Sequence, residues 1–278
     1  MAGTLYLVGT PIGNLGDLSP RARKVLETSD FIAAEDTRVS IKLLNYFDIR
    51  KPLVSYYEHN KYASGERILE RLLAGESCAL VTDAGMPAIS DPGADMVELC
   101  VRHGVEVTVV PGPCAAVSAL ALSALPTGRF TFEGFLSTSK KSRASHLESL
   151  VREPRTMIFY EAPHKLLKTL EDLLAALGDR PVALCRELTK LHEEVLRTTL
   201  SAAVAHYTEN EPRGEFVLVV AGAPEPSEPQ ATQEEALMLM QKYRGEGRSL
   251  KEAAKLAAAD TGYSKNELYD LGLKQKER

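Results

Sequence analysis

The chain has 278 residues, of which 44% are hydrophobic and 26% are charged, and its formal net charge at pH 7 is −5. This length fits two domains with a sizeable core, and the composition excludes wholesale disorder. The negative net charge argues against a protein coated in positive charge, but it is compatible with a local basic patch that binds nucleic acid.

No segment is expected to span a membrane, because the longest nearly apolar run, residues 115–125, is too short and too rich in small side chains. Residues 1–8 lack the basic start of a secretory signal. The cysteines at positions 78, 100, 114 and 185 form no Cys-x-x-Cys pair and lie in or beside apolar segments. We therefore expect reduced, buried thiols in a cytoplasmic protein.

Short apolar runs predict ten strands. Many are continuous runs of Val, Ile, Leu and Ala, as is typical of strands covered on both faces. In chain order they are residues 4–8, 31–34, 53–56, 79–82, 105–110, 130–135, 157–160, 182–185, 195–199 and 216–220.

Amphipathic helical segments alternate with these strands. One begins at Ser19 and Pro20, another runs from Ser64 to Gly75, and a third runs from Pro163 to Gly178. The alternation of strand and helix predicts right-handed crossovers, mostly parallel sheets and an α/β fold.

The chain divides into four predicted parts. Two α/β domains occupy residues 1–120 and 121–224, a linker rich in Pro and Glu occupies 225–233, and a helical tail occupies 234–278. The tail is typical of a helix-turn-helix module. Its expected helices are residues 234–243, 250–259 and 265–270.

Four loops of unusual composition follow strands of the first half. Residues 9–17 contain three glycines that let the backbone approach a ligand, but their spacing matches neither a dinucleotide fingerprint nor a Walker A loop. Residues 34–38 group three ionisable side chains. Residues 81–93 hold two Gly, two Pro and two Asp, and residues 111–116 are mostly small.

Each loop alone has a structural explanation beside the functional one. Residues 9–17 and 111–116 can be tight turns, residues 34–38 can cap the next helix, and Asp83 and Asp91 can either bind ribose hydroxyls or cap helix 94–103. Loops that follow parallel strands lie at one edge of the sheet, where ligands bind. Together the four loops therefore predict a small-molecule pocket at that edge.

Two segments of the second half, residues 159–164 and 185–190, also follow predicted strands and are expected to face the same cleft. Tyr160 can pack on a ligand, and Arg186, Glu187 and Lys190 can bind a polar substrate, although surface salt bridges explain these charges equally well. The scattered histidines form no H-E-x-x-H motif, so no metal site is expected.

A basic window spans residues 137–155, with five positive charges against two negative ones. It is either a solvated helix face or a contact surface for RNA phosphates. Its basic residues are Lys140, Lys141, Arg143, Arg152 and Arg155.

Seven motifs, taken together and in order, resemble the ribosomal RNA small subunit methyltransferase I family of the tetrapyrrole methylase superfamily. The resemblance covers nearly the whole chain and is weaker in the tail, because helix-turn-helix patterns are common. The motifs are GTPIGN at 9–14, AEDTR at 34–38, DAGMPAISDPG at 83–93, PGPCA at 111–115, EGFL at 133–136, FYEAPH at 159–164 and RELTK at 186–190.

The resemblance implies two α/β domains of tetrapyrrole-methylase type that bind S-adenosylmethionine in the cleft between them, in a homodimer. It implies 2′-O-methylation of a cytidine ribose in small-subunit (16S) rRNA. Because the chain is acidic overall, naked duplex RNA is a poor partner, and we expect the assembled small ribosomal subunit as the partner. The cofactor contacts carried over by motif are Pro11, Gly85, Met86, Pro87, Ile89, Pro111, Cys114, Ala115, Tyr160 and Leu188.

Methyl transfer to a ribose hydroxyl needs two aligned substrates and is helped by a base that removes the hydroxyl proton. Glu187 is the candidate base, and Lys190 either orients the ribose or acts as a base if burial lowers its pKa. Glu35 and Asp36 are rival bases. The expected substrate contacts are Arg38, Lys140, Lys141, Arg143 and Arg186.

Two other functions remain open. One is a methyltransferase for a tetrapyrrole or another small molecule. Tetrapyrrole-modifying members of the superfamily have Gly-Asp-Pro where this chain has Gly85-Met86-Pro87, which disfavours this function. The basic window also disfavours it. The other is a metabolite-sensing regulator whose tail reads DNA, which Glu267 and Asp270 in the last short helix disfavour.

Overall fold

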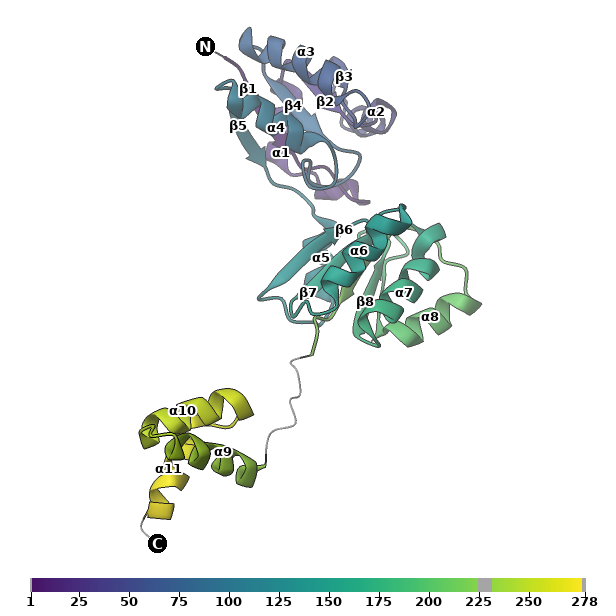
Figure 1. The fold of residues 1–278 in the computed structure, drawn as a ribbon. Helices are drawn as coiled ribbons and strands as arrows, with labels where there is room; N and C mark the ends of the chain where they lie inside the picture. Colours follow the sequence, from purple (N-terminus) through teal and green to yellow (C-terminus); the bar gives the residue numbers. More distant parts are fainter. Residues whose placement is uncertain (1, 225–231, 277–278) are drawn as a thin grey trace. The chain divides into compact units, whose positions relative to one another are not determined.

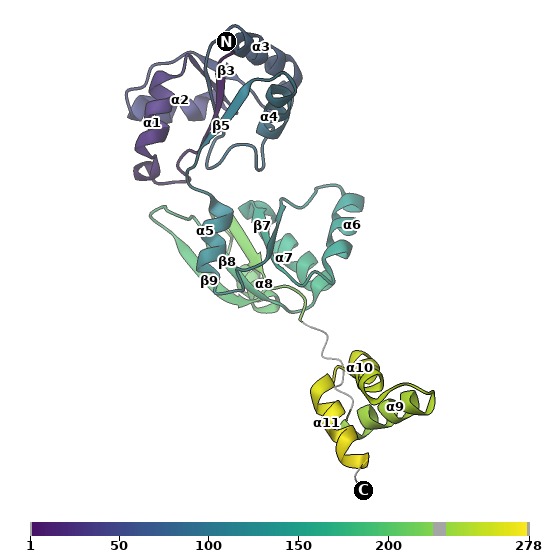
Figure 2. The same cartoon turned by 90° about the vertical axis from the view of Figure 1, so that its left-hand side faces the viewer.

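The computed structural model of the chain describes residues 2–224 and 232–276. They belong to two compact units, residues 1–223 and 224–278. The first unit contains two five-stranded sheets with their covering helices, and the second is helical (Figure 1, Figure 2). None of the described helices is long and apolar enough to cross a membrane.

The first sheet has the order β3-β2-β4-β1-β5, and all its strand pairs are parallel, as the sequence predicts. The carboxyl ends of its strands therefore meet at one edge. Its elements are β1 (Thr4–Val8), the 3-10 helix η1 (Leu15–Asp17), α1 (Pro20–Thr28), β2 (Phe31–Ala34), α2 (Thr37–Tyr46), β3 (Leu53–Ser55), α3 (Lys61–Leu73), β4 (Cys78–Val81), α4 (Gly93–Arg102) and β5 (Glu106–Val110).

Helices cover both faces of this sheet. Phe31 packs with Ile68 of α3 and Met96 of α4 on one face, and Val8 packs with Leu26 of α1 on the other. This cover on both faces explains the continuous apolar runs of the strands. Helix α3 begins at Lys61 and not at the predicted Ser64. Ser64 instead lies buried within the first turn of the helix.

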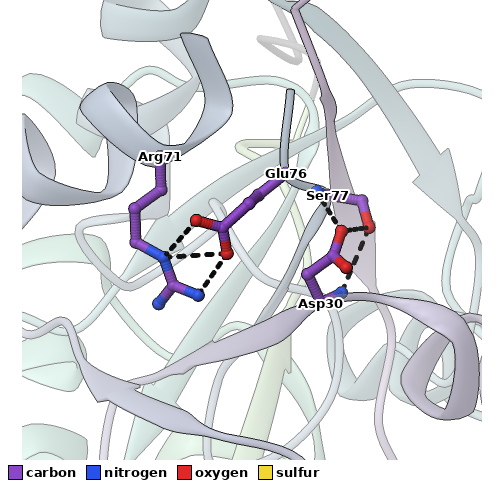
Figure 3. Close-up of polar contacts among 4 residues, drawn as sticks. All are labelled: Asp30, Arg71, Glu76 and Ser77. Atoms are coloured by element: carbon purple, nitrogen blue, oxygen red, sulfur yellow. Dashed lines mark hydrogen bonds and ion pairs between the residues drawn. The ribbon is translucent and has the colours of Figure 1, made fainter. Parts of the chain in front are cut away.

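The edge of the first sheet at the amino ends of its strands carries a polar cluster, shown in Figure 3. Arg71 Nη2 lies 2.5 Å from Glu76 Oε2, and the guanidinium carbon lies 3.5 Å from the centroid of the Phe31 ring. Asp30 accepts hydrogen bonds from the backbone N–H and the hydroxyl of Ser77, each at 2.7 Å. We call Asp30, Arg71, Glu76 and Ser77 the amino-edge cluster; it ties together the segments that lead into β2 and β4.

The second sheet has the order β6-β7-β10-β8-β9. Its elements, preceded by the helix that leads into it, are α5 (Ala115–Leu122), β6 (Phe130–Gly134), α6 (Lys140–Leu150), β7 (Thr156–Glu161), α7 (Pro163–Leu177), β8 (Pro181–Arg186), β9 (Glu194–Thr199), α8 (Leu200–Glu209) and β10 (Phe216–Val220).

The predicted parallel arrangement is wrong for this second sheet. Only β6 and β7 pair in parallel, whereas β7–β10, β10–β8 and β8–β9 are antiparallel. The short segment 187–193 joins β8 to β9 without a helix, which makes a hairpin, and β10 enters between β7 and β8 in the opposite direction.

Helix α5 follows the last strand of the first sheet in the chain but packs on the second sheet. Its Ala116, Ala119 and Leu120 are buried in one apolar cluster with Ile158 of β7 and Val219 of β10. We therefore propose a boundary between the two α/β domains before Ala115, instead of the expected boundary at residue 120.

The second unit contains α9 (Gln233–Gly245), α10 (Leu250–Thr261) and α11 (Lys265–Lys276) around a small core. Thr232 and Ser249 are the N-cap residues of α9 and α10, and each belongs to a capping box. Gly262 ends α10 in the left-handed conformation. The last helix is longer than the expected 265–270. Of the predicted linker 225–233, residues 225–231 lie outside the described residues.

Candidate active site

A cavity of about 490 Å³ lies in the first unit, where loops of both sheets meet. We call it the active cavity; its volume is in the range of small-molecule pockets. The residues that line it are Ile12, Glu35, Thr82, Asp83, Ala84, Gly85, Met86, Ile89, Ser90, Asp91, Cys114, Ala115, Phe135, Tyr160, Glu161, Ala162, Pro163, Cys185, Leu188, Lys190, Glu215, Phe216 and Val217.

The loops of the first half lie at this cavity as the sequence predicts. Most of the predicted cofactor contacts line it, whereas Pro11, Pro87 and Pro111 do not. Those that line it are Gly85, Met86, Ile89, Cys114, Ala115, Tyr160 and Leu188.

Tyr160 forms a rigid part of the apolar wall. Its hydroxyl accepts a hydrogen bond from the backbone N–H of Ala116 at 3.2 Å, and its ring packs edge-on against Phe132 and Phe135 at centroid distances of 5.0 and 5.6 Å. Burial raises the pKa of the Tyr160 hydroxyl. The side chain is therefore held in place before any ligand enters.

Carboxylates line another part of the cavity. Glu35 accepts a hydrogen bond from the Thr82 hydroxyl, and Asp83 Oδ1 accepts one from the backbone N–H of Asp36 at 3.0 Å. Burial raises the pKa of Asp83 above its usual value, because the charged form loses solvent. This part of the cavity wall is therefore acidic.

Asp91 supports the structural interpretation of its loop. Its Oδ1 accepts hydrogen bonds from the backbone N–H groups of Ala88 at 3.0 Å and Gly93 at 2.8 Å. Gly93 is the first residue of α4, so the carboxylate fixes the turn that starts this helix. Burial raises the Asp91 pKa, and the two N–H groups oppose that shift.

A lysine with two carboxylate partners lies on the side of the second sheet. Lys190 Nζ is 2.8 Å from Glu187 Oε1 and 2.9 Å from Glu215 Oε2. We call these three residues the Lys190 cluster. Burial alone would lower the Lys190 pKa, but the bonds to Glu187 and Glu215 outweigh it and raise the pKa. A role of Lys190 as a base, which would need burial to lower this pKa, is therefore not favoured.

Glu187, the predicted base, is the partner of this lysine. Its Oε1 accepts hydrogen bonds from Lys190 Nζ and from the backbone N–H of Glu215 at 2.9 Å, and it is not among the residues that line the cavity. The bond to Lys190 lowers the Glu187 pKa, which makes the carboxylate a weaker base. Glu187 is therefore placed to hold the Lys190 ammonium by this hydrogen bond.

The backbone around the Lys190 cluster is tightly constrained. Glu187 and Thr189 have φ angles of 50° and 67°, in the left-handed region that side chains disfavour. A Cβ on Gly214 would lie 2.5 Å from Glu187 Cγ, and one on Gly13 would lie 2.5 Å from Lys190 Cγ. Gly13 thus lets the first glycine-rich loop approach the loop that carries Lys190.

The predicted substrate contacts are not brought together at the active cavity. Arg38 pairs with Asp36 at 2.6 Å, and Arg186 pairs with Glu194 at 2.9 Å. The bonds from Arg38 lower the Asp36 pKa to about 2, so Asp36 is a poor rival base. Lys140 and Arg143 line a second cavity, which Lys141 does not line.

Sequence reasoning missed part of the cavity wall, namely Glu215, Phe216 and Val217 at the start of β10. They lie there because β10 is antiparallel to its neighbours: Phe216 pairs with Glu161 at the end of β7 and with Arg186 at the end of β8. The predicted pocket rests on loops that follow strands, whereas these residues precede or begin a strand. Among the described residues, no group of three or more His, Cys, Asp or Glu side chains could hold a metal ion.

Comparison with known proteins gives matches over nearly the full chain. Residues 4–204 match the tetrapyrrole (corrin/porphyrin) methylases, and residues 230–276 match the RsmI C-terminal HTH domain. The chain is 47% identical to the ribosomal RNA small subunit methyltransferase I of Synechocystis sp. over 272 residues, 98% of each protein. It is 46% identical to that of Bacillus subtilis over 275 residues, 96% of this chain and 93% of the other.

Solved structures share the two-sheet fold. A uroporphyrin-III C-methyltransferase from Thermus thermophilus aligns with a TM-score of 0.56 and 22% identity, covering 78% of this chain and 94% of the other. The same kind of enzyme complexed with S-adenosylhomocysteine aligns with a TM-score of 0.55, at 22% identity over 79% and 97%. Diphthine synthase aligns with a TM-score of 0.60 at 16% identity, over 79% and 90%.

Proposed function

The chain belongs to the ribosomal RNA small subunit methyltransferase I family, and from this premise we propose that it methylates a cytidine ribose 2′-hydroxyl in small-subunit (16S) rRNA, with S-adenosylmethionine as cofactor. The observation that supports this function best is the active cavity itself. It combines most of the predicted cofactor contacts, from both halves, with Lys190 and its carboxylate partners.

The cavity fits S-adenosylmethionine in size and in charge. The cofactor carries a sulfonium and an ammonium against one carboxylate, and the acids Glu35 and Asp83 complement that positive charge. The apolar side chains of Ile89, Tyr160 and Leu188 suit the nucleoside part. When bound, the cofactor supplies a methyl group that needs only an aligned oxygen nucleophile.

Lys190 acts in this proposal as a cation. Its ammonium stabilises the negative charge that develops on the ribose oxygen as the hydroxyl proton leaves. Glu187 and Glu215 hold the ammonium in place through two ion pairs. Among the carboxyl groups that line the cavity, Glu35 and Asp83 are our candidates to accept the proton; burial raises the Asp83 pKa and so strengthens it as a base.

The environment of Met86 argues against a tetrapyrrole substrate. Its sulfur accepts a hydrogen bond from the backbone N–H of Gly112 at 3.2 Å, and a Cβ on Gly9 would lie 2.7 Å from that sulfur. This side chain fills the space between the loops after β1 and β5 and offers no carboxylate. The assembled small ribosomal subunit, a homodimer and a cytoplasmic location remain predictions.

The function is tested with labelled S-adenosylmethionine and small ribosomal subunits that lack the modification. Free rRNA, fully modified subunits and a tetrapyrrole serve as parallel substrates. We expect label in the unmodified subunits, in a dinucleotide that resists alkaline hydrolysis, because alkali cleaves RNA through a free 2′-hydroxyl. Label in the tetrapyrrole alone would refute the rRNA substrate. Cofactor binding without transfer to any substrate would favour a metabolite-sensing regulator.

A further inference from the structure

A second cavity of about 580 Å³ lies between α6 and α7. We call it the α6–α7 groove. Most of the charged side chains that line it are basic. The groove is lined by Ser137, Thr138, Lys140, Arg143, Ala144, Leu147, His164, Lys165, Lys168, Thr169 and Asp172.

The groove has more basic side chains than carboxylates to pair with them. Arg143 and Lys168 both pair with Asp172, at 2.7 and 2.8 Å. Lys140 and Lys165 are exposed, and within residues 2–224 and 232–276 no ion pair is formed by either. The groove therefore presents two ammonium groups available to an anion, beside the hydroxyls of Ser137 and Thr138.

The groove adjoins the active cavity along the chain. Phe135 lines the active cavity, and Ser137, two residues later, lines the groove. Likewise, Pro163 lines the active cavity and the next residue, His164, lines the groove. These are the segments that follow β6 and β7, a parallel pair of neighbouring strands. The two cavities therefore lie at the same ends of these two neighbouring strands.

A hydrogen-bonded wall separates the two cavities. Thr169 lines the groove, and its hydroxyl donates to Glu161, which lines the active cavity. Arg143 donates to the same Thr169 hydroxyl at 2.8 Å and to Asp172 at 2.7 Å. Arg143, with a side chain only 16% exposed, thus stiffens the wall, which argues against the phosphate contact expected for it from the sequence.

We propose that the α6–α7 groove binds the phosphodiester backbone of the substrate RNA next to the nucleotide whose ribose enters the active cavity. Lys140 and Lys165 neutralise the phosphates, and the hydroxyls of the groove donate hydrogen bonds to them. Proteins commonly position a nucleic acid through such backbone contacts and recognise the target elsewhere. This inference rests on the proposed rRNA substrate.

The test removes both unpaired lysines. The double variant Lys140→Gln/Lys165→Gln is compared with the wild type and with Lys24→Gln/Lys42→Gln, which makes the same charge change at exposed positions of α1 and α2. Binding to unmodified small subunits and to their free rRNA is measured by filter retention at several salt concentrations. Calorimetry then measures the affinity for S-adenosylmethionine and for inorganic phosphate.

We expect RNA affinity to fall about tenfold in the groove variant, and the slope of log K against log salt to decrease by about one per lysine. Cofactor affinity stays unchanged, and the control variant binds RNA like the wild type. Unchanged RNA affinity and slope in the groove variant overturn the proposal. Loss of phosphate affinity alone also overturns it, because the groove would then serve a free anion.

The same assay separates this inference from the function on which it rests. If the wild type binds RNA through the groove but transfers no methyl group, the proposed activity fails and the groove stands. If the wild type does not bind RNA, both fail.

Discussion

The amino-edge cluster and the Lys190 cluster are both built on an ion pair of similar exposure. Arg71 and Glu76 are 33% and 39% exposed and lie 2.5 Å apart; Lys190 and Glu187 are 30% and 20% exposed and lie 2.8 Å apart. Exposed pairs of this kind contribute at most about 1 kcal/mol to stability. The strength of the pairing therefore does not distinguish the two clusters.

The surroundings of the two clusters do distinguish them. Arg71 lies over the ring of Phe31, and no member of its cluster lines the active cavity. Lys190 lines that cavity, has a second carboxylate in Glu215 and extends from a segment with left-handed backbone at Glu187. The left-handed backbone and the second carboxylate fit our proposal that the Lys190 cluster places a charge in the cavity, whereas the amino-edge cluster joins the segments that lead into β2 and β4.

The largest effect is expected from removal of the Lys190 charge. Lys190→Met should lower the rate of methyl transfer about 10²–10³-fold, because the developing oxyanion loses its cation. Lys190→Arg should retain most of the rate, since it keeps the charge. Steady-state kinetics checks both, with Lys24→Met as the control for the loss of a surface lysine. Equal inactivity of the methionine and arginine variants would instead support a neutral lysine that acts as a base.

A smaller effect is expected at Gly214, which makes room for Glu187. Gly214→Ala should lower the rate about tenfold, because the new Cβ would lie 2.5 Å from Glu187 Cγ and displace the partner of Lys190. The matched control is Gly104→Ala, where φ is also left-handed, at 69°, but nothing lies within 4 Å of the added Cβ. If both variants lose the same rate, backbone strain explains the effect and the clash with Glu187 does not.

In the amino-edge cluster we expect a loss of stability without a loss of rate. Arg71→Ala should lower the free energy of unfolding by about 1–2 kcal/mol, through the lost ion pair and the lost contact with the Phe31 ring. Calorimetric unfolding should show a midpoint lower by a few degrees. The rate of methyl transfer, measured well below that midpoint, should stay at the wild-type value; a parallel loss would refute the division of roles.

The smallest effect is a change in acid stability. The bond from Arg71 lowers the Glu76 pKa, and the bonds from Ser77 lower the Asp30 pKa. Since both pKa values are lower in the folded state, the stabilisation is complete above about pH 4.5 and is lost as the pH falls through the folded values. Glu76→Gln should therefore flatten the dependence of the unfolding midpoint on pH between about 5 and 3.

The control for that measurement is Glu66→Gln, the same change at an exposed position of α3. A pH dependence as steep in Glu76→Gln as in Glu66→Gln would contradict the assignment.

Much of the fold could be predicted from the sequence because its signals are local. Each expected strand is present with ends shifted by at most a residue or two, and the loops after β1, β2, β4 and β5 reach the active cavity as expected. Continuous apolar runs and glycine-rich turns report directly on burial and backbone freedom. The pairing of strands is not local, and the direction of β10 was therefore missed.

The partners of individual charged residues could not be predicted from the sequence. Arg143 belongs to a basic window in the sequence, but its charge is taken up by Asp172, 29 residues away on α7. The pKa of Lys190 depends on Glu215, which follows it by 25 residues and approaches it only through the antiparallel β10. Composition shows how many charges a segment has, whereas tertiary packing decides which of them remain available to a ligand.

The packing of α5 has a consequence for anyone who wishes to divide this protein into expressible pieces. A fragment that began at residue 121 would leave behind Ala116, Ala119 and Leu120 and would expose apolar side chains of β7 and β10 to water. The boundary that we propose places the cut in the segment 111–114, after β5 has ended and before α5 begins. Helix α5 thus packs as part of the second domain, and every truncated fragment of that domain should include it.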